Sequence, residues 1–273
     1  MTPPTFTALT LSLDRGIAEV RLNRPDKSNA MNDAMWQEIR QAFAWIDATP
    51  EARVAILSGA GKNFCAGIDL AMLGSIQQRI AHADGARSRE ALRRLILDLQ
   101  DCLSAIERCR KPVLAAIHGA CVGGALDLVT CCDMRYATPD AVFAIKEIDL
   151  AMVADVGTLQ RLPRLIGQGI ARELAYTGRN VEAAEAEKLG LINRVFASAD
   201  DLSAGVRQLA ASIAAKSPLA TRGLKEVMNY SRDHTVADGL DFVATWNAGV
   251  LLSGDLSEAI AAQRERRAPN FGD

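Results

Sequence analysis

The chain has 273 residues, with 31 Lys and Arg residues against 33 Asp and Glu residues and a formal net charge of −2. This length allows a large buried core, and the balanced charge, with no basic stripe along any expected helix, argues against nucleic acid as a partner. The first residues, MTPPTFTALT, match neither a signal peptide nor a transit peptide, and no apolar run reaches membrane-spanning length. We therefore expect a soluble, cytoplasmic protein with no membrane partner.

The six cysteines form neither a CxxC motif nor a Cys/His arrangement of the kind that binds a metal ion. We therefore expect no metal site, and free, mostly buried thiols in a reducing compartment. The final residues, Asn270-Phe271-Gly272-Asp273, differ from the peroxisomal Ser-Lys-Leu signal, which agrees with the expected cytoplasmic location.

The first part of the chain predicts strands that alternate with helices. Apolar and polar residues alternate over 7–22 around Asp14-Arg15-Gly16, which predicts a hairpin. Beyond the hairpin, helical periodicity and short apolar runs predict a helix over 32–48, a strand over 54–57, a helix over 88–109, a strand over 113–117 and a helix from Gly124. Repeated β-α-β units indicate right-handed crossovers and parallel sheet.

The last quarter of the chain has only helical periodicity. Strand patterns stop at about Asp200, and helices are expected over 202–214, 218–230 and 237–252. The sequence therefore predicts a core with the active site over residues 1–200 and a helical region over residues 201–273.

Two segments, 54–70 and 113–128, share one pattern, in which an apolar strand leads through small residues into a helix. Backbone N–H groups at helix starts can donate to developing negative charge. The small residues that allow a ligand carbonyl to approach are Ala66, Gly67, Gly123 and Gly124. The two turns together predict an oxyanion hole, in which each donor contributes about a hundred- to a thousandfold in rate. Alternatively, these glycines only permit tight turns and close packing.

Three acidic residues stand in apolar surroundings: Asp127, Glu147 and Asp155. Asp127 follows Gly124 by three residues, which places it one helical turn from the expected donor. Two carboxyl groups that face one pocket drive their pKa values apart, so one site can supply both a base and an acid. Alternatively, each acid caps a helix or pairs with a basic residue, and Asp155 precedes Val156-Gly157-Thr158 as an N-cap would.

The segments LNRPDKSNAMN, GKNFCAGIDL and HGACVGGALDLVTCCD resemble the signature segments of the crotonase (enoyl-CoA hydratase/isomerase) superfamily, and the resemblance spans nearly the whole chain. KEIDLAMVADVGTLQRLPRLIG, AKSPLATRGLKEVMNYSRDH and LDFVATWN are similar to segments of one subfamily, the Δ3,5-Δ2,4-dienoyl-CoA isomerases. The resemblance implies an α/β fold, the crotonase (ClpP/crotonase-like) spiral of β-β-α units. It also implies that the C-terminal helical region packs subunits into homotrimers or homohexamers, as dimers of trimers.

The resemblance also implies roles for particular residues. The N–H groups of Ile68 and Gly124 would hold the thioester oxygen. Asp155 would be the base that removes the C2 proton of a 3,5-dienoyl-CoA, and Glu147 the acid that returns a proton at C6. Asp127 would support them near the conjugated chain. Coenzyme A arrives as part of the acyl-CoA substrate, so no separate cofactor is expected.

The two lysines and the reaction class each have more than one interpretation. Lys27 and Lys62 resemble basic residues that face the coenzyme A phosphates in relatives. It is an equally good explanation that both are ordinary surface lysines. Asp127 and Glu147 stand where hydratases keep two glutamates that activate a water, but those enzymes typically have glycine in place of Asp155. The alternatives to an isomerase are therefore an enoyl-CoA hydratase or other crotonase reaction, and a non-catalytic acyl-CoA or RNA-binding relative.

Overall fold

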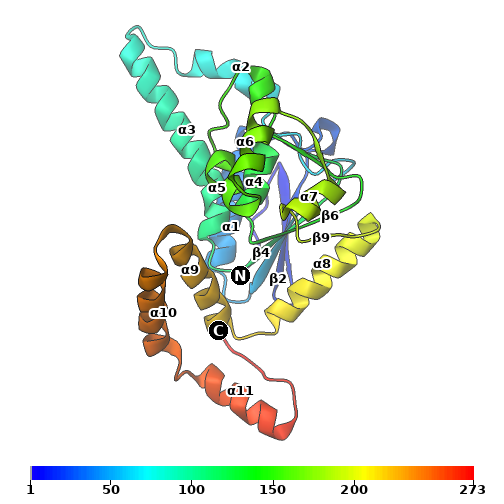
Figure 1. Cartoon of the computed structure of the whole chain (residues 1–273), viewed down its shortest axis with the longest axis vertical. Coiled ribbons are helices and arrows are strands. Elements are labelled where there is room, and N and C mark those ends of the chain that lie inside the picture. The colour runs from blue at the N-terminus through cyan, green and yellow to red at the C-terminus, as the bar shows by residue number, and fades with distance from the viewer. Residues whose placement is uncertain (1) are drawn as a thin grey trace.

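A sheet of six strands forms the centre of the molecule (Figure 1). The computed structural model describes residues 2–273. In spatial order the strands are β1 (Leu9–Asp14), β2 (Ile17–Leu22), β3 (Val54–Gly59), β4 (Val113–Ile117), β6 (Met134–Ala137) and β9 (Arg194–Val195). Only β1 and β2 pair antiparallel, and every later pair in this sheet is parallel. The predicted hairpin and parallel sheet are therefore confirmed.

The hairpin turn has the backbone that its sequence predicts. Asp14 pairs with Ile17, so only Arg15 and Gly16 form the loop. Both have a positive φ, of 46° and 81°. A two-residue hairpin of this kind needs positive φ at both positions because its twist then matches that of the strands.

A second sheet of three short strands carries the site. It consists of β5 (Ala120–Val122), β7 (Val142–Ala144) and β8 (Val181–Glu182). Strand β4 continues through β5 into α4 (Gly124–Thr130), and β6 continues through β7 toward α5 (Thr158–Leu165). Because β4 pairs parallel with β6 and β5 pairs parallel with β7, these two β-β-α units stack as turns of a spiral. The expected fold class is confirmed.

Helices cover both faces of the large sheet. On one face lie α1 (Asp33–Ala48), which begins at its N-cap Asn32, and α3 (Gly85–Arg108). On the other face lies α8 (Ala199–Ala214), whose Leu202, Val206 and Ala210 pack against alternate strand residues such as Val54 and Ile56. Because side chains alternate across a strand, β2, β3, β4 and β6 supply residues to both cores.

The C-terminal helices α9 (Pro218–Asp233), α10 (Val236–Val250) and α11 (Gly254–Glu265) project from one end of the molecule (Figure 1). The first two were expected, and α11 was not. Helix α9 is joined to the core by Lys225, whose ammonium group donates to Asp133 at 2.7 Å and to the carbonyl of Lys111 at 3.1 Å. Helix α8 packs on the sheet, and the division of the chain at residue 200 stays a prediction.

The remaining helices are η1 (Pro25–Lys27), α2 (Leu70–Arg79), η2 (Ile148–Leu150), α6 (Gln168–Thr177) and α7 (Ala183–Leu189). Within residues 2–273 no helix is both long and apolar enough to cross a membrane. All six cysteines are free and buried, as expected. Across the same described residues, no three His, Cys, Asp or Glu side chains form a group that could hold a metal ion.

Candidate active site

Residues 65–69 bond to a neighbouring segment on one side. The N–H of Met31 donates to the carbonyl of Gly67 at 2.8 Å, and the N–H of Asp69 donates to the carbonyl of Met31 at 3.0 Å. Met31 and Ile68 therefore pair as in a parallel bridge. In such a bridge the bonds use the residues on either side of Ile68, so the N–H of Ile68 faces away from Met31.

The same segment also bonds to β5. The N–H of Cys65 donates to the carbonyl of Ala120 at 2.9 Å, and the N–H of Val122 donates to the carbonyl of Cys65 at 3.2 Å. One residue further on, the N–H of Gly123 donates to the carbonyl of Ala144 at the end of β7, at 2.9 Å. We call residues 65–69 and 122–124 the oxyanion turns. Backbone hydrogen bonds fix both turns, so their geometry does not depend on side-chain rotamers.

The two turns approach each other at their glycines. A Cβ atom on Gly67, whose φ is +86°, would lie 2.8 Å from the carbonyl oxygen of Val122 and 3.2 Å from the nitrogen of Gly124. A Cβ on Gly124 would lie 3.7 Å from the nitrogen of Ile68. Neither the N–H of Ile68 nor that of Gly124 has an acceptor within residues 2–273. Two unpaired donors from distant segments thus lie side by side, as an oxyanion hole requires.

One detail differs from the sequence expectation of two helix-start donors. Gly124 is the first residue of α4. Ile68, in contrast, precedes α2 by two residues, because Asp69 is the N-cap and its side chain accepts from the N–H of Ala71. The bridge to Met31 therefore holds the donor at Ile68, which is not part of a helix N-terminus.

Sequence reasoning did not identify Asn29, which supports the first turn. Asn29 is fully buried, and its side-chain amide donates to the carbonyls of Ala60, Asn63 and Phe64 at 2.8, 2.9 and 3.0 Å. Its side-chain oxygen accepts from the N–H of Arg24 at 2.8 Å. One asparagine thus fixes the loop that leads into residues 65–69. The sequence signal was its place in LNRPDKSNAMN, a segment quoted above only for its family resemblance.

Glu147 lies beside the oxyanion turns. It follows β7, and its Oε1 atom is 3.3 Å from the position that a Cβ on Gly123 would take. Its Oε2 atom is buried and has no hydrogen-bond partner in the described part of the chain. Burial raises the pKa of Glu147 to about 7, and the neighbouring charges of Asp127 and Asp155 act in the same direction. Near neutral pH this side chain can therefore carry a proton.

Asp127 is fully buried on α4. Its Oδ1 atom accepts from the N–H of Thr158, the first residue of α5, at 2.5 Å, while Oδ2 finds no partner among residues 2–273. Burial raises the pKa of Asp127 to about 6, against the opposing effect of the Thr158 N–H. Asp127 therefore caps the start of a neighbouring helix, α5. This agrees with the capping alternative, except that Asp127 belongs to α4.

Asp155 belongs to the irregular segment 151–157 between η2 and α5 and is exposed. The N-cap of α5 is Gly157, with a φ of +132°, so the N-cap alternative for Asp155 is wrong. Partial burial raises the pKa of the Asp155 carboxyl above its usual range. Its charge in turn raises the pKa of both Asp127 and Glu147. We call these three acids the carboxyl cluster, because the charge of Asp155 acts on Asp127 and the charges of both act on Glu147.

The two lysines named from the sequence lie on adjacent segments. Lys27 ends η1, and Lys62 follows Gly61, whose Cβ position would lie 2.7 Å from Cβ of Pro25. Both lysines are exposed, and neither pairs with a carboxylate within residues 2–273. Ala66 is also exposed, close along the chain to Lys62. This edge of the first oxyanion turn therefore carries two unpaired positive charges.

Comparison with known proteins identifies the class first. The chain belongs to the enoyl-CoA hydratase/isomerase family, whose model matches residues 12–273. The solved structure of an enoyl-CoA hydratase from Bacillus anthracis is similar, with a TM-score of 0.89 and 30% identity over 97% of this chain and 99% of that chain. A putative enoyl-CoA hydratase from Streptomyces coelicolor also has a TM-score of 0.89, at 29% identity over 99% of this chain and 96% of that chain.

Curated relatives confirm the narrower resemblance. The peroxisomal Δ(3,5)-Δ(2,4)-dienoyl-CoA isomerase of Arabidopsis thaliana is 49% identical over 98% of this chain and 96% of that protein. The mitochondrial Δ(3,5)-Δ(2,4)-dienoyl-CoA isomerase of Mus musculus is 46% identical over 94% of this chain and 79% of that protein. Because both relatives are organellar by name, the expected cytoplasmic location is wrong. Address signals are read by receptors and leave no mark on the composition of a folded core.

Proposed function

We propose that this chain is a Δ3,5-Δ2,4-dienoyl-CoA isomerase. The observation that carries the proposal is the position of Glu147, a carboxyl with its pKa raised to about 7, beside two unpaired backbone donors and within the field of Asp155. A reaction that moves a proton between two distant carbon atoms needs two carboxyl groups in different protonation states. The similarity to proteins named for this reaction supports the same assignment.

The proposed reaction proceeds through a thioester enolate. The N–H groups of Ile68 and Gly124 donate to the thioester oxygen, and the Asp155 carboxylate takes a proton from C2. The electron pair of the C–H bond then spreads over the conjugated chain to the oxygen. Protonation at C6 by Glu147 leaves double bonds at C2 and C4. The donors lower the barrier because they bind the enolate oxygen more strongly than the ground-state carbonyl.

The two carboxyl groups differ in the way that this reaction requires. Burial raises the pKa of Glu147 to about 7, so a large fraction of the enzyme holds the proton that C6 receives near neutral pH. Asp155 is exposed, so water can solvate its carboxylate, although partial burial raises its pKa above the usual range. Asp127 supports the pair by holding α5. Coenzyme A arrives with the substrate, and we propose no metal ion and no other cofactor.

The proposal is tested by following ultraviolet absorbance with 3,5-octadienoyl-CoA and, in parallel, a 2-enoyl-CoA. We expect the wild type to form the conjugated 2,4-diene. Asp155→Asn and Glu147→Gln each lower kcat by about a hundred- to ten-thousandfold, the range for general acid–base groups. Asp149→Asn is the matched control, because Asp149 is an exposed acid that pairs with Lys146.

An enoyl-CoA hydratase is the second candidate, favoured by the names of the similar solved structures and by the closeness of Asp127 to Glu147. It predicts hydration of the 2-enoyl thioester without diene conversion, and no effect of Asp155→Asn. That outcome would overturn the isomerase assignment.

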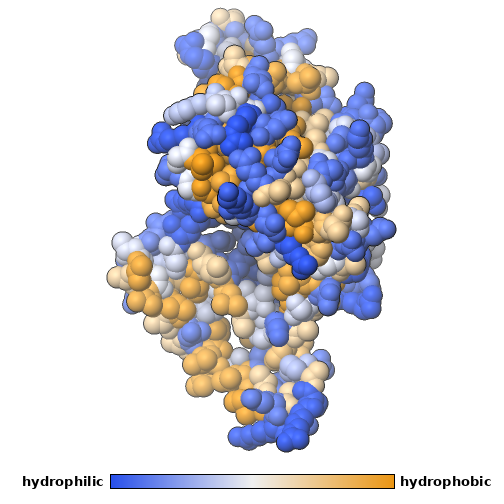
Figure 2. Space-filling model, turned by 45° about the vertical axis from the view of Figure 1, so that its right-hand side comes forward, coloured by the Kyte–Doolittle hydropathy of each residue, from blue (hydrophilic) through white to orange (hydrophobic). Residues whose placement is uncertain are grey.

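We also infer that the chain assembles as a homotrimer or homohexamer through α9–α11. Large apolar side chains are exposed there, among them Leu224 at 65%, Met228 at 70% and Leu240 at 64%. Figure 2 shows apolar surface over these helices at the lower end of the molecule. Exposed patches of this kind are typical of protein interfaces. Light scattering should give three or six times 29.3 kDa, and Met228→Glu should lower that mass.

A further inference from the structure

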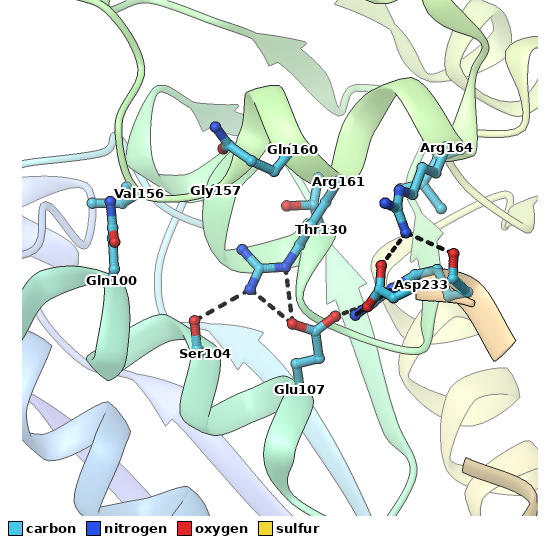
Figure 3. A pocket seen from close by; sticks show the side chains of 12 residues that line it. Gln100, Ser104, Glu107, Thr130, Val156, Gly157, Gln160, Arg161, Arg164 and Asp233 are labelled. Carbon is cyan, nitrogen blue, oxygen red and sulfur yellow. Dashed lines mark hydrogen bonds and ion pairs between the residues drawn. The ribbon is translucent and has the colours of Figure 1, made fainter. Parts of the chain in front are cut away.

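A polar cleft lies between α3, α5 and α9 (Figure 3). Its floor includes the backbone of Val156 and Gly157, the two residues that follow Asp155. Its walls carry Gln100 and Glu107 from α3 and Arg161 from α5. The cleft therefore borders the segment that carries the proposed base.

Gln100 binds the main chain of Asp155. Its Nε2 atom donates to the Asp155 carbonyl oxygen at 2.6 Å. In the part of the chain that the structure describes, no other residue forms a hydrogen bond with Asp155. Segment 151–157 belongs to neither a helix nor a strand, so regular secondary structure does not hold it. Its neighbours Ala154 and Val156 are buried in the core, and among the described residues Gln100 supplies the one hydrogen bond to Asp155 itself.

A second contact from the same helix fixes the end of the segment. Arg161 donates to Glu107 at 2.8 Å and to Ser104 at 3.2 Å, and the Arg161 and Glu107 side chains are each only 16% exposed (Figure 3). A Cβ on Gly157 would lie 1.9 Å from Nη1 of Arg161, so the guanidinium group packs directly against the Gly157 backbone. The φ of +132° at this position also favours glycine.

The three α3 residues involved share one helix face. Gln100, Ser104 and Glu107 are spaced at i, i+4 and i+7, which brings their side chains to the same side of a helix. The N–H of Thr158, one residue after Gly157, is held from the other direction by Asp127. Residues 155–158 are therefore clamped between α3 and α4, and Gln100 supplies the contact nearest to the proposed base.

We propose that Gln100 is a positioning residue for the isomerisation, which fixes the main chain of Asp155 so that its carboxylate meets the C2 proton. This inference rests on the proposed function. Gln100 acts through Asp155 and need not touch the substrate. Misplacing a reacting group by about 1 Å can cost about a hundredfold in rate, so one lost tether has a measurable effect.

Gln100→Met tests the proposal, since methionine has a similar length but no donor. The matched control is Gln160→Met, because Gln160 lines the same cleft on α5 and its side chain forms no hydrogen bond within residues 2–273. We expect Gln100→Met to lower kcat about ten- to a hundredfold with KM changed less than about threefold. Amide hydrogen exchange at Met152 and Thr158, whose N–H groups donate to Glu147 and Asp127 at the two ends of the segment, should become faster in this variant alone.

The inference is overturned if Gln100→Met keeps wild-type kcat and wild-type exchange, or if Gln160→Met loses as much activity. A purely structural defect would raise exchange throughout α3 and α5 and would also count against it. If the wild type converts no dienoyl-CoA, the proposed function fails. The exchange comparison then decides separately whether Gln100 fixes the Asp155 segment.

Discussion

The oxyanion turns and the carboxyl cluster lie side by side but are held by different means. In the turns every functional group is a backbone N–H, and backbone hydrogen bonds from Met31, Cys65 and Ala144 fix them. In the carboxyl cluster every functional group is a side chain, and the three acids come from α4, from the end of β7 and from an irregular segment. Backbone hydrogen bonds therefore hold the oxyanion turns in place, whereas the carboxyl cluster needs supporting contacts to its side chains and segments.

This difference predicts how each half tolerates change. Substitutions in the oxyanion turns should lower activity by steric blocking, because the donors are backbone N–H groups that no side-chain truncation removes. The carboxyl cluster should fail through charge and position, because its pKa values depend on burial and on neighbouring charges.

Gly124→Ala should abolish most of the activity by blocking the turns. The new methyl group would lie 3.7 Å from the nitrogen of Ile68 and 2.8 Å from Cε of Met31, in the space beside the two donors. We expect kcat to fall about a hundred- to a thousandfold, comparable with the loss of one donor. The control is Gly74→Ala in α2, where a Cβ meets nothing within 4 Å. Equal kcat in both variants would remove the oxyanion role of this turn.

Asp127→Asn should stabilise the folded protein at high pH. Asn keeps an acceptor for the Thr158 N–H but removes a buried charge. The pKa of Asp127 is raised from 3.8 to about 6, so the folded state binds the proton more tightly and wild-type stability falls as pH rises through this window. The shift corresponds to about 3 kcal/mol. Urea unfolding should show a larger gain at pH 8 than at pH 5, and a pH-independent difference would contradict this account.

The kcat profile should fall on its alkaline side through a pKa of about 7, because Glu147 must be protonated to deliver its proton. Well above that pKa the loss approaches about tenfold per pH unit. Asp127→Asn removes one of the charges that raise this pKa, so the alkaline limb should move to lower pH. Asp149→Asn should leave the limb unchanged. If the pKa of the alkaline limb is the same in Asp127→Asn as in the wild type, the charge of Asp127 does not act on Glu147.

Lys27→Ala and Lys62→Ala should have the smallest effect. Both lysines are exposed and unpaired within residues 2–273, so each would attract the coenzyme A phosphates through solvent-screened charge. We expect KM to rise about two- to fivefold for each variant at low salt, with kcat unchanged. The rise should shrink in 0.5 M salt. Lys188→Ala, an exposed lysine on α7, should leave KM unchanged.

Much of the fold was readable because its signals are local. Helical periodicity predicted α1 and α3 within three residues at each end, and alternation with a turn predicted the β1–β2 hairpin. The strands β5, β7 and β8 have only two or three residues each, too few to show a pattern. They form because β4 and β6 bring them together, which is a tertiary effect.

Local residue patterns identified the groups of the candidate site: small residues at two turns, and the acids at 127, 147 and 155. The contacts of these groups come from the folded chain, in which Asp127 holds α5, Glu147 lies beside Gly123, and Gln100 holds the main chain of Asp155. Burial of one face of a helix or strand produces a periodic pattern of apolar residues, and helix capping produces a local pattern, so both can be recognised in a sequence. Distances between remote carboxyls, and the pKa values that follow from them, exist only once the chain has folded.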